Sequence, residues 1–90
     1  MNNPSLFDAV KLEACIQCLF GLASPATYRE SFLSTEQLAS IPLKPLRRPD
    51  EESMFDYRHR LDIWRADIDR KVKVEMAAYL SERLKELILP

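Results

Sequence analysis

Two cysteines stand at the C-x-x-C spacing of zinc sites and thioredoxin-type redox centres, in the run Cys15-Ile16-Gln17-Cys18. A structural zinc site needs four ligands, and the other soft ligand in the chain is the single histidine, His59. A redox centre usually opens a helix, where the dipole lowers the thiol pKa, whereas both cysteines fall inside an apolar helical segment. We therefore expect reduced, buried thiols that hold no metal or other cofactor.

Asp56 and His59 stand three residues apart, the offset at which helical bundles present a carboxylate and an imidazole to a di-metal centre. Such a centre needs further inward carboxylates, and Arg58 and Arg60 flank the histidine with positive charge that opposes a cation. We expect these residues to lie on a solvated helix face. A metal or redox protein built from this pair and the cysteines is the least favoured of the functions weighed for this chain.

Arginines gather around the middle of the chain and could form a patch for nucleic acid. The candidate residues are Arg47, Arg48, Arg58 and Arg60. Acidic residues alternate with basic ones along the segment that follows, and they cancel most of the field that would attract phosphates. Nucleic-acid binding therefore requires that dimerisation bring the arginines of two copies together.

The segment 41–49 carries prolines every three or four residues, a spacing that excludes a helix and favours an extended, polyproline-like strap. Within it, residues 42–47 (PLKPLR) fit the P-x-x-P-x-R pattern of ligands for SH3 domains. Patterns of this length also arise by chance. We therefore expect a stiff linker that packs along the surface through Ile41, Leu43 and Leu46.

An apolar stripe runs along the segment 50–89, which contains no Gly or Pro. It repeats at about 3.67 residues per step, the period of a nearly straight helix. Pairs such as Asp67/Lys71 and Asp69/Lys73 place acid before base at a spacing that supports the helix. Trp and Tyr are over-represented at interface hot spots, and both occur on the stripe. The interface residues predicted from it are Met54, Tyr57, Leu61, Trp64, Ile68, Val72 and Met76.

The 90 residues are 47% apolar and 30% charged, with a net charge of −1. This composition is globular, and a chain of this length forms one domain, 1–90, with a thin core. The apolar run 14–23 is shorter than the roughly 20 residues of a membrane span, and the N-terminus lacks the basic start of a secretory signal. We expect a cytoplasmic protein with no membrane partner. The chain has one histidine and one glycine, too few of the residues from which most catalytic sites are built, so we expect no enzyme activity.

Capping signals divide the first half of the chain into helices. The first helix should begin at Asn3-Pro4 and run to about Gly21. Its second half is apolar on nearly every side, which predicts burial all round. Capping boxes then predict two short helices, over about 26–33 and 35–40.

The last predicted helix covers about 50–88, with Asp50, Glu51 and Glu52 on its first turn, where the dipole favours negative charge. Its length of about 58 Å far exceeds the radius of gyration of about 12 Å expected for a compact globule of this size. The helix either breaks in its most polar stretch, 65–73, or continues and is covered by a second copy. Because no Gly, Pro or Asn marks a break, we favour the continuous helix and a dimeric, all-α bundle.

The expected function is that of a non-enzymatic helical interaction module, an adaptor, assembly factor or inhibitor. It would act as a homodimer toward a further protein. The alternative is a nucleic-acid-associated regulator that uses the arginine patch formed on dimerisation. The alternating charges favour the first of these functions.

Overall fold

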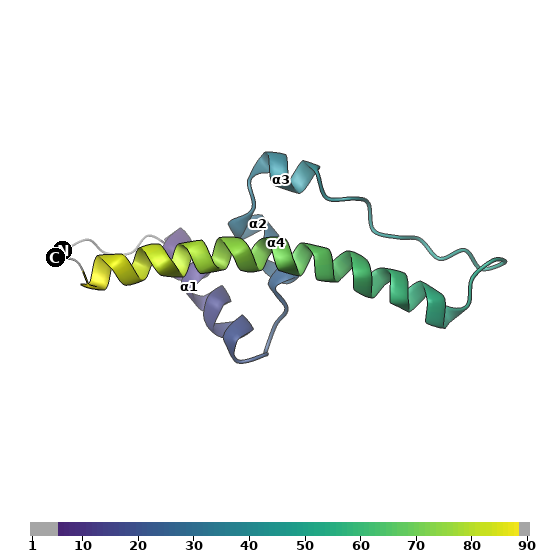
Figure 1. The fold of residues 1–90 in the computed structure, drawn as a ribbon, viewed down its shortest axis with the longest axis horizontal. Helices are drawn as coiled ribbons and strands as arrows, with labels where there is room; N and C mark the ends of the chain where they lie inside the picture. The colour runs from purple at the N-terminus through teal and green to yellow at the C-terminus, as the bar shows by residue number, and fades with distance from the viewer. Residues whose placement is uncertain (1–5, 89–90) are drawn as a thin grey trace.

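The computed structural model describes residues 6–88, and within that range every regular element is a helix. The elements in chain order are α1 (Leu6–Leu19), the 3-10 helix η1 (Pro25–Tyr28), α2 (Arg29–Phe32), α3 (Thr35–Ala39) and α4 (Met54–Ile88). Helix α4 forms the long axis of the molecule, and the shorter elements lie to its sides (Figure 1). The predicted all-α class is confirmed, with about three quarters of the described residues helical. The helix start predicted at Asn3-Pro4 lies outside the described residues.

Helix α4 begins at Met54 because Ser53 caps it. The Ser53 hydroxyl accepts a hydrogen bond from the Asp56 backbone N–H at 3.1 Å. The 35 residues of α4 run without a break over about 52 Å, so the predicted continuous helix is confirmed. The helix starts later than the residue 50 that we predicted. Residues 49–51 form a turn before the cap, and the acidic run therefore lies outside the first helical turn.

Helix α1 ends at Leu19 in a Schellman motif centred on Gly21. Gly21 has a φ of 71°, in the left-handed region that favours glycine. Its N–H donates to the Cys18 carbonyl at 3.1 Å. The next N–H, of Leu22, donates to the Gln17 carbonyl at 2.9 Å. These two bonds satisfy carbonyls left open at the helix end, and the predicted helix end is confirmed.

The two short helices predicted over 26–33 and 35–40 are both present. The first is η1 continuing into α2, and its cap comes from α4, because the Asp69 carboxylate accepts a hydrogen bond from the Ala26 N–H at 2.7 Å. The second, α3, begins with a capping box. The Ser34 hydroxyl accepts from the Gln37 N–H at 3.1 Å, and the Gln37 side chain accepts from the Ser34 N–H at 2.8 Å.

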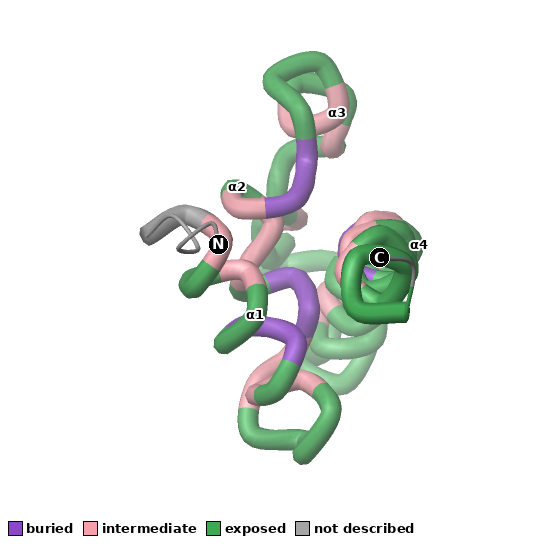
Figure 2. The backbone as a smooth tube through the Cα atoms, turned by 90° about the vertical axis from the view of Figure 1, so that its left-hand side faces the viewer, coloured by how far each residue is buried: buried purple, intermediate pink, exposed green. Residues whose placement is uncertain are grey.

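The core lies where α1, η1 and α2 meet the middle of α4, and buried positions gather there in the view along α4 (Figure 2). The buried apolar residues are Ala14, Cys15, Ala26, Phe32, Leu33, Ile68, Val72 and Met76. Ile68, Val72 and Met76 follow each other at steps of four, which keeps them on one side of α4. These three residues were predicted to contact a second copy, and their own chain covers them instead.

Helix α1 is buried on one side only. Ala14 and Cys15 pack into the core, whereas Leu19 and the following Phe20 are 81% and 71% exposed. The prediction that the second half of α1 is buried all round therefore holds for the side that faces α4. It is wrong for the other side of the single chain, because nothing within residues 6–88 covers that side.

The molecule is elongated, with extents of 61 × 28 × 19 Å and a radius of gyration of 16.6 Å. A compact chain of this length has a radius of gyration of about 12 Å. The difference arises because α4 extends beyond the elements that pack on it. Residues 42–48 are extended and run back beside the N-terminal half of α4, as predicted for the strap (Figure 1). The predicted packing through Leu43 and Leu46 is wrong, because these side chains are 94% and 80% exposed, and only Ile41 of the three predicted contacts is half-buried. Among the described helices, none is long and apolar enough to cross a membrane.

Candidate functional site

An apolar groove with a volume of about 480 Å³ lies between α1 and the C-terminal half of α4. Leu12, Ile16 and Leu19 form its α1 side, and Ala77 and Leu80 form its α4 side. The three α1 residues recur at steps of three or four, which places them on one side of that helix. The other lining residues are Cys15, Cys18, Pro25, Lys73 and Met76. With Lys73 as the charged residue of this set, the groove suits an apolar occupant better than a polar small molecule.

Exposed apolar side chains extend the groove along both helices. The turn after α1 exposes Phe20 and Leu22, and the last turns of α4 expose Leu84 and Leu87. Leu80, Leu84 and Leu87 follow at i, i+4 and i+7, so they continue one side of α4 beyond the end of the groove. Large exposed apolar side chains beside an apolar groove are typical of a contact with another molecule. The groove with these exposed residues is called the groove face below.

Both cysteines line the groove as free thiols. Burial raises the pKa of Cys15, and the neighbouring Cys18 raises it further. Burial also raises the pKa of Cys18, with a second contribution from the Asp69 carboxylate. Thiols with raised pKa values stay protonated near neutral pH and are poor nucleophiles. The two side chains therefore contribute apolar contacts to the groove.

The structure does not assemble the metal-ligand candidates. Asp56 and His59 are exposed near the start of α4, far along that helix from the cysteines' groove. In the described part of the chain, no three His, Cys, Asp or Glu side chains are placed to hold a metal ion. The carboxylate and imidazole thus lie on a solvated helix face, where their spacing alone creates no site.

The predicted interface residues outside the core take different positions. Met54 is exposed at the start of α4, and Leu61 is half-buried. Tyr57 and Trp64 are also half-buried, and both donate hydrogen bonds to the strap, residues 41–49. A dimer contact through these residues stays a prediction, but two of the aromatic polar groups already have partners within the chain.

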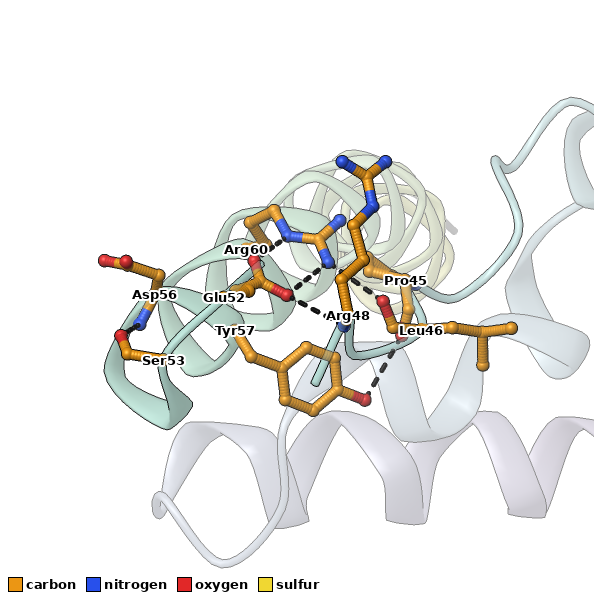
Figure 3. Close-up of polar contacts among 8 residues, drawn as sticks. All are labelled: Pro45, Leu46, Arg48, Glu52, Ser53, Asp56, Tyr57 and Arg60. Carbon is orange, nitrogen blue, oxygen red and sulfur yellow. Dashed lines mark hydrogen bonds and ion pairs between the residues drawn. The ribbon is translucent and has the colours of Figure 1, made fainter. Parts of the chain in front are cut away.

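The strap is held by donors on one side of α4. The Trp64 Nε1–H donates to the Pro42 carbonyl at 2.8 Å, and the Tyr57 hydroxyl donates to the Pro45 carbonyl at 3.2 Å. Figure 3 shows the Tyr57 hydroxyl pointing at the strap backbone. An extended, proline-rich segment makes no internal hydrogen bonds, so its carbonyls are free to accept from water or from side chains. Helix α4 supplies the side-chain donors.

The predicted basic patch is partly neutralised. The Arg60 guanidinium donates a hydrogen bond to the Leu46 carbonyl at 2.9 Å. It also forms a bidentate ion pair with the Glu52 carboxylate, with N–O distances of 2.5 and 2.7 Å (Figure 3). The hydrogen bond from Arg60 lowers the pKa of Glu52, and the same bond raises the pKa of Arg60. The other predicted patch residues are exposed: Arg47, Arg48 and Arg58. Arg60 thus joins the strap to α4, with its charge balanced by Glu52.

Tyr79 links α4 to the first turns of α1 and so helps to position one side of the groove. Its hydroxyl donates to the Asp8 carboxylate at 2.6 Å, and its ring meets that of Phe32 edge-on at a centroid distance of 6.0 Å. The Lys11 ammonium lies 5.5 Å from the centroid of each ring. Burial, followed by the hydrogen bond to Asp8, raises the pKa of Tyr79 to about 12.

Sequence reasoning missed both the groove and the side-chain contacts to the strap. The apolar residues of the groove were visible, since Leu12, Ile16 and Leu19 share the i, i+4, i+7 spacing of Leu80, Leu84 and Leu87. The spacing does not say that α1 packs beside this end of α4. No protein-family model, curated protein or solved structure matches the chain, and the role of the groove face is therefore inferred from its geometry.

Proposed function

We propose that this protein is a non-enzymatic interaction module that acts as a homodimer, with the groove face as the contact between the copies. The observation that carries the proposal is the groove itself, an apolar channel bordered by exposed leucines on two helices. The dimer would present its remaining surface to a further protein, as an adaptor, assembly factor or inhibitor.

The exposed area supports a partner of substantial size. The chain exposes 7210 Å². A compact monomer of 10.5 kDa is expected to expose about 5,400 Å², which leaves an excess of about 1,800 Å². A standard protein interface buries about 800 Å² on each partner. Less than half of the excess would therefore suffice for a stable dimer.

A second copy fits the groove because the chain carries both halves of the contact. The last turns of α4 extend past α1 and present Leu84 and Leu87, an apolar helical stripe. The groove beside α1 is an apolar channel open to such a helix. In a two-fold dimer, the end of α4 from each copy would lie against the groove of the other, which satisfies both surfaces with one symmetric contact.

The test compares two aspartate substitutions on exposed apolar residues of α4. Leu84 is 56% exposed on the groove face, and Ile63 is 58% exposed on the side of α4 away from the core. Neither substitution should prevent folding, because both side chains are largely solvated in the single chain. Leu84→Asp would place an unpaired carboxylate in the dimer contact, at a cost of several kcal/mol.

Light scattering coupled to gel filtration at tens of micromolar gives the oligomeric state. We expect about twice the 10.5 kDa of one chain for the unmodified protein and for Ile63→Asp. Leu84→Asp should give the mass of one chain. A monomeric unmodified protein, or loss of the dimer in Ile63→Asp alone, would show that the groove face is not the contact.

The nucleic-acid alternative has less support. Arg47, Arg48 and Arg58 are exposed, but they lie near the start of α4, about 30 Å along the helix from the groove at Leu80. A dimer through the groove face would not gather the arginines of two copies into one patch. A salt-dependent mobility shift with DNA or RNA separates the two functions.

A further inference from the structure

The strap combines a recognition pattern with a restricted backbone. Residues 42–47 fit P-x-x-P-x-R, and each strap proline fixes its own φ while restricting the residue before it to extended conformations. The described backbone from 42 to 48 is extended throughout. Such a segment loses little conformational entropy on binding, which is why proline-rich ligands suit aromatic-lined grooves.

Helix α4 already contacts the strap as a proline-recognition surface would. Trp64 and Tyr57 present two aromatic donors seven residues apart, a helical rise of about 10.5 Å. Their acceptors are the carbonyls of Pro42 and Pro45, which are about 9.3 Å apart in a polyproline helix. The two spacings match closely, so one straight helix can hold both carbonyls of the extended strap.

The exposed fractions of the strap side chains show which side of the strap contacts α4. Leu43 and Leu46 are 94% and 80% exposed, while Ile41 and Pro45 are half-buried. With three residues per turn, Leu43 and Leu46 share one edge of a polyproline helix. That edge holds Leu43, the first variable position of P-x-x-P, and Leu46, the variable position before the motif arginine. The carbonyls of both motif prolines and the half-buried Pro45 ring lie along the side engaged by α4, whereas the Pro42 ring is exposed.

We propose that residues 41–47 are a masked ligand for an SH3-type domain, and that α4 competes with this domain for the same side of the strap. The Arg47 side chain is exposed, and Lys44 and Arg48 are exposed beside it. A partner domain therefore needs carboxylates next to its aromatic groove to receive the Arg47 guanidinium. This proposal does not depend on the dimer, because the strap and the groove lie on opposite sides of α4.

Masking reduces the apparent affinity by the fraction of molecules in which the strap is free. The contacts that set this fraction include the three side-chain hydrogen bonds to strap carbonyls and the ion pair of Arg60 with Glu52. The double variant Tyr57→Phe, Arg60→Gln removes two of these hydrogen bonds and the ion pair. It leaves Trp64 and every residue of the motif in place.

The test measures binding of a purified SH3 domain with an acidic specificity pocket to full-length chains by titration calorimetry. If the strap is free in about one molecule in ten of the unmodified protein, the unmasked double variant should bind the SH3 domain roughly tenfold or more tightly than the unmodified protein does. Adding Arg47→Glu to the double variant should weaken binding at least tenfold. Arg58→Gln, an exposed change nearby on α4, is the matched control and should leave the affinity unchanged.

Far-UV circular dichroism confirms that each variant retains the helices. No binding by a folded double variant, or binding that Arg47→Glu does not weaken, would reject the SH3-type partner. Equal affinity of the unmodified protein and the double variant would reject masking by α4. Neither result would alter the dimer mass, so failure here is distinguishable from failure of the proposed function.

Discussion

Asp69 is the residue whose removal tests how the short helices are attached to α4. Its carboxylate accepts a hydrogen bond from the Ala26 N–H at 2.7 Å, across 43 residues of sequence. Ala26 is a buried core residue, so its N–H cannot turn to bulk water when the acceptor is lost. Asp69→Ala should therefore leave a buried donor without a partner and loosen η1 from α4.

The magnitude follows from the kind of bond. A hydrogen bond to a charged group contributes about 1.5–3 kcal/mol, against a total stability of about 5–13 kcal/mol for a chain of this length. Asp69→Ala should cost about 2–3 kcal/mol, and Asp69→Asn about half of that, because the amide keeps a neutral acceptor. With a urea m-value of about 1–1.5 kcal/mol/M, the alanine variant should lower the unfolding midpoint by about 2 M.

Urea unfolding followed by circular dichroism at 222 nm measures these shifts. Asp62→Ala is the matched control, since Asp62 is an exposed aspartate two turns earlier on the same helix. Its midpoint should stay within about 0.5 M of the unmodified protein, as expected for a surface change. If Asp69→Ala moves the midpoint no more than Asp62→Ala does, the contact with Ala26 does not stabilise the fold and the reasoning fails.

Three further predictions concern single contacts. The pKa of Tyr79 is raised from 10.0 to about 12, so its contribution to stability is complete below pH 10 and is lost as the pH rises toward 12. Tyr79→Phe should reduce this alkaline loss in melting temperatures recorded between pH 9 and 12, and an unchanged pH profile would contradict it. Replacing Cys15 and Cys18 together by Ala should cost about 1–3 kcal/mol by opening small cavities, without changing any metal content. Stoichiometric zinc or iron that disappears in this variant would overturn the packing role. Gly21→Ala should lower the free energy of unfolding, measured by thermal unfolding, by about 1–2 kcal/mol. The cost arises from the φ of 71° alone, because a Cβ there would meet no atom within 4 Å. An unchanged stability would show that the turn relaxes.

The helices could be predicted because local chemistry determines their ends. Gly21 stops α1, the Ser34 capping box starts α3, and the absence of Gly and Pro after residue 50 allows one long helix. The start of α4 was placed too early because acidic residues suit a first turn. Glu52 instead lies between the turn 49–51 and the capping Ser53, and its carboxylate accepts a hydrogen bond from Arg60 of the helix.

The tertiary contacts could not be predicted, because spacing within a helix does not say what lies opposite. Asp69 and Lys73 have the spacing of a surface ion pair, yet Asp69 caps η1. Tyr57 and Trp64 occupy the apolar stripe, but their polar atoms reach the strap carbonyls. In each case the deciding partner lies more than ten residues away in sequence, where local periodicity carries no information.

The length of α4 explains how one small chain could carry the two contact surfaces that we propose. Successive turns of the helix rise about 5.4 Å, so the strap contacts at Tyr57 and the groove at Leu80 are about 35 Å apart along its axis. Sites this far apart, with no shared partner, are expected to act additively. The same length leaves the groove face uncovered and the core thin. Association through the groove face would then stabilise the folded chain by mass action, while the strap could open and close at the other end without disturbing it.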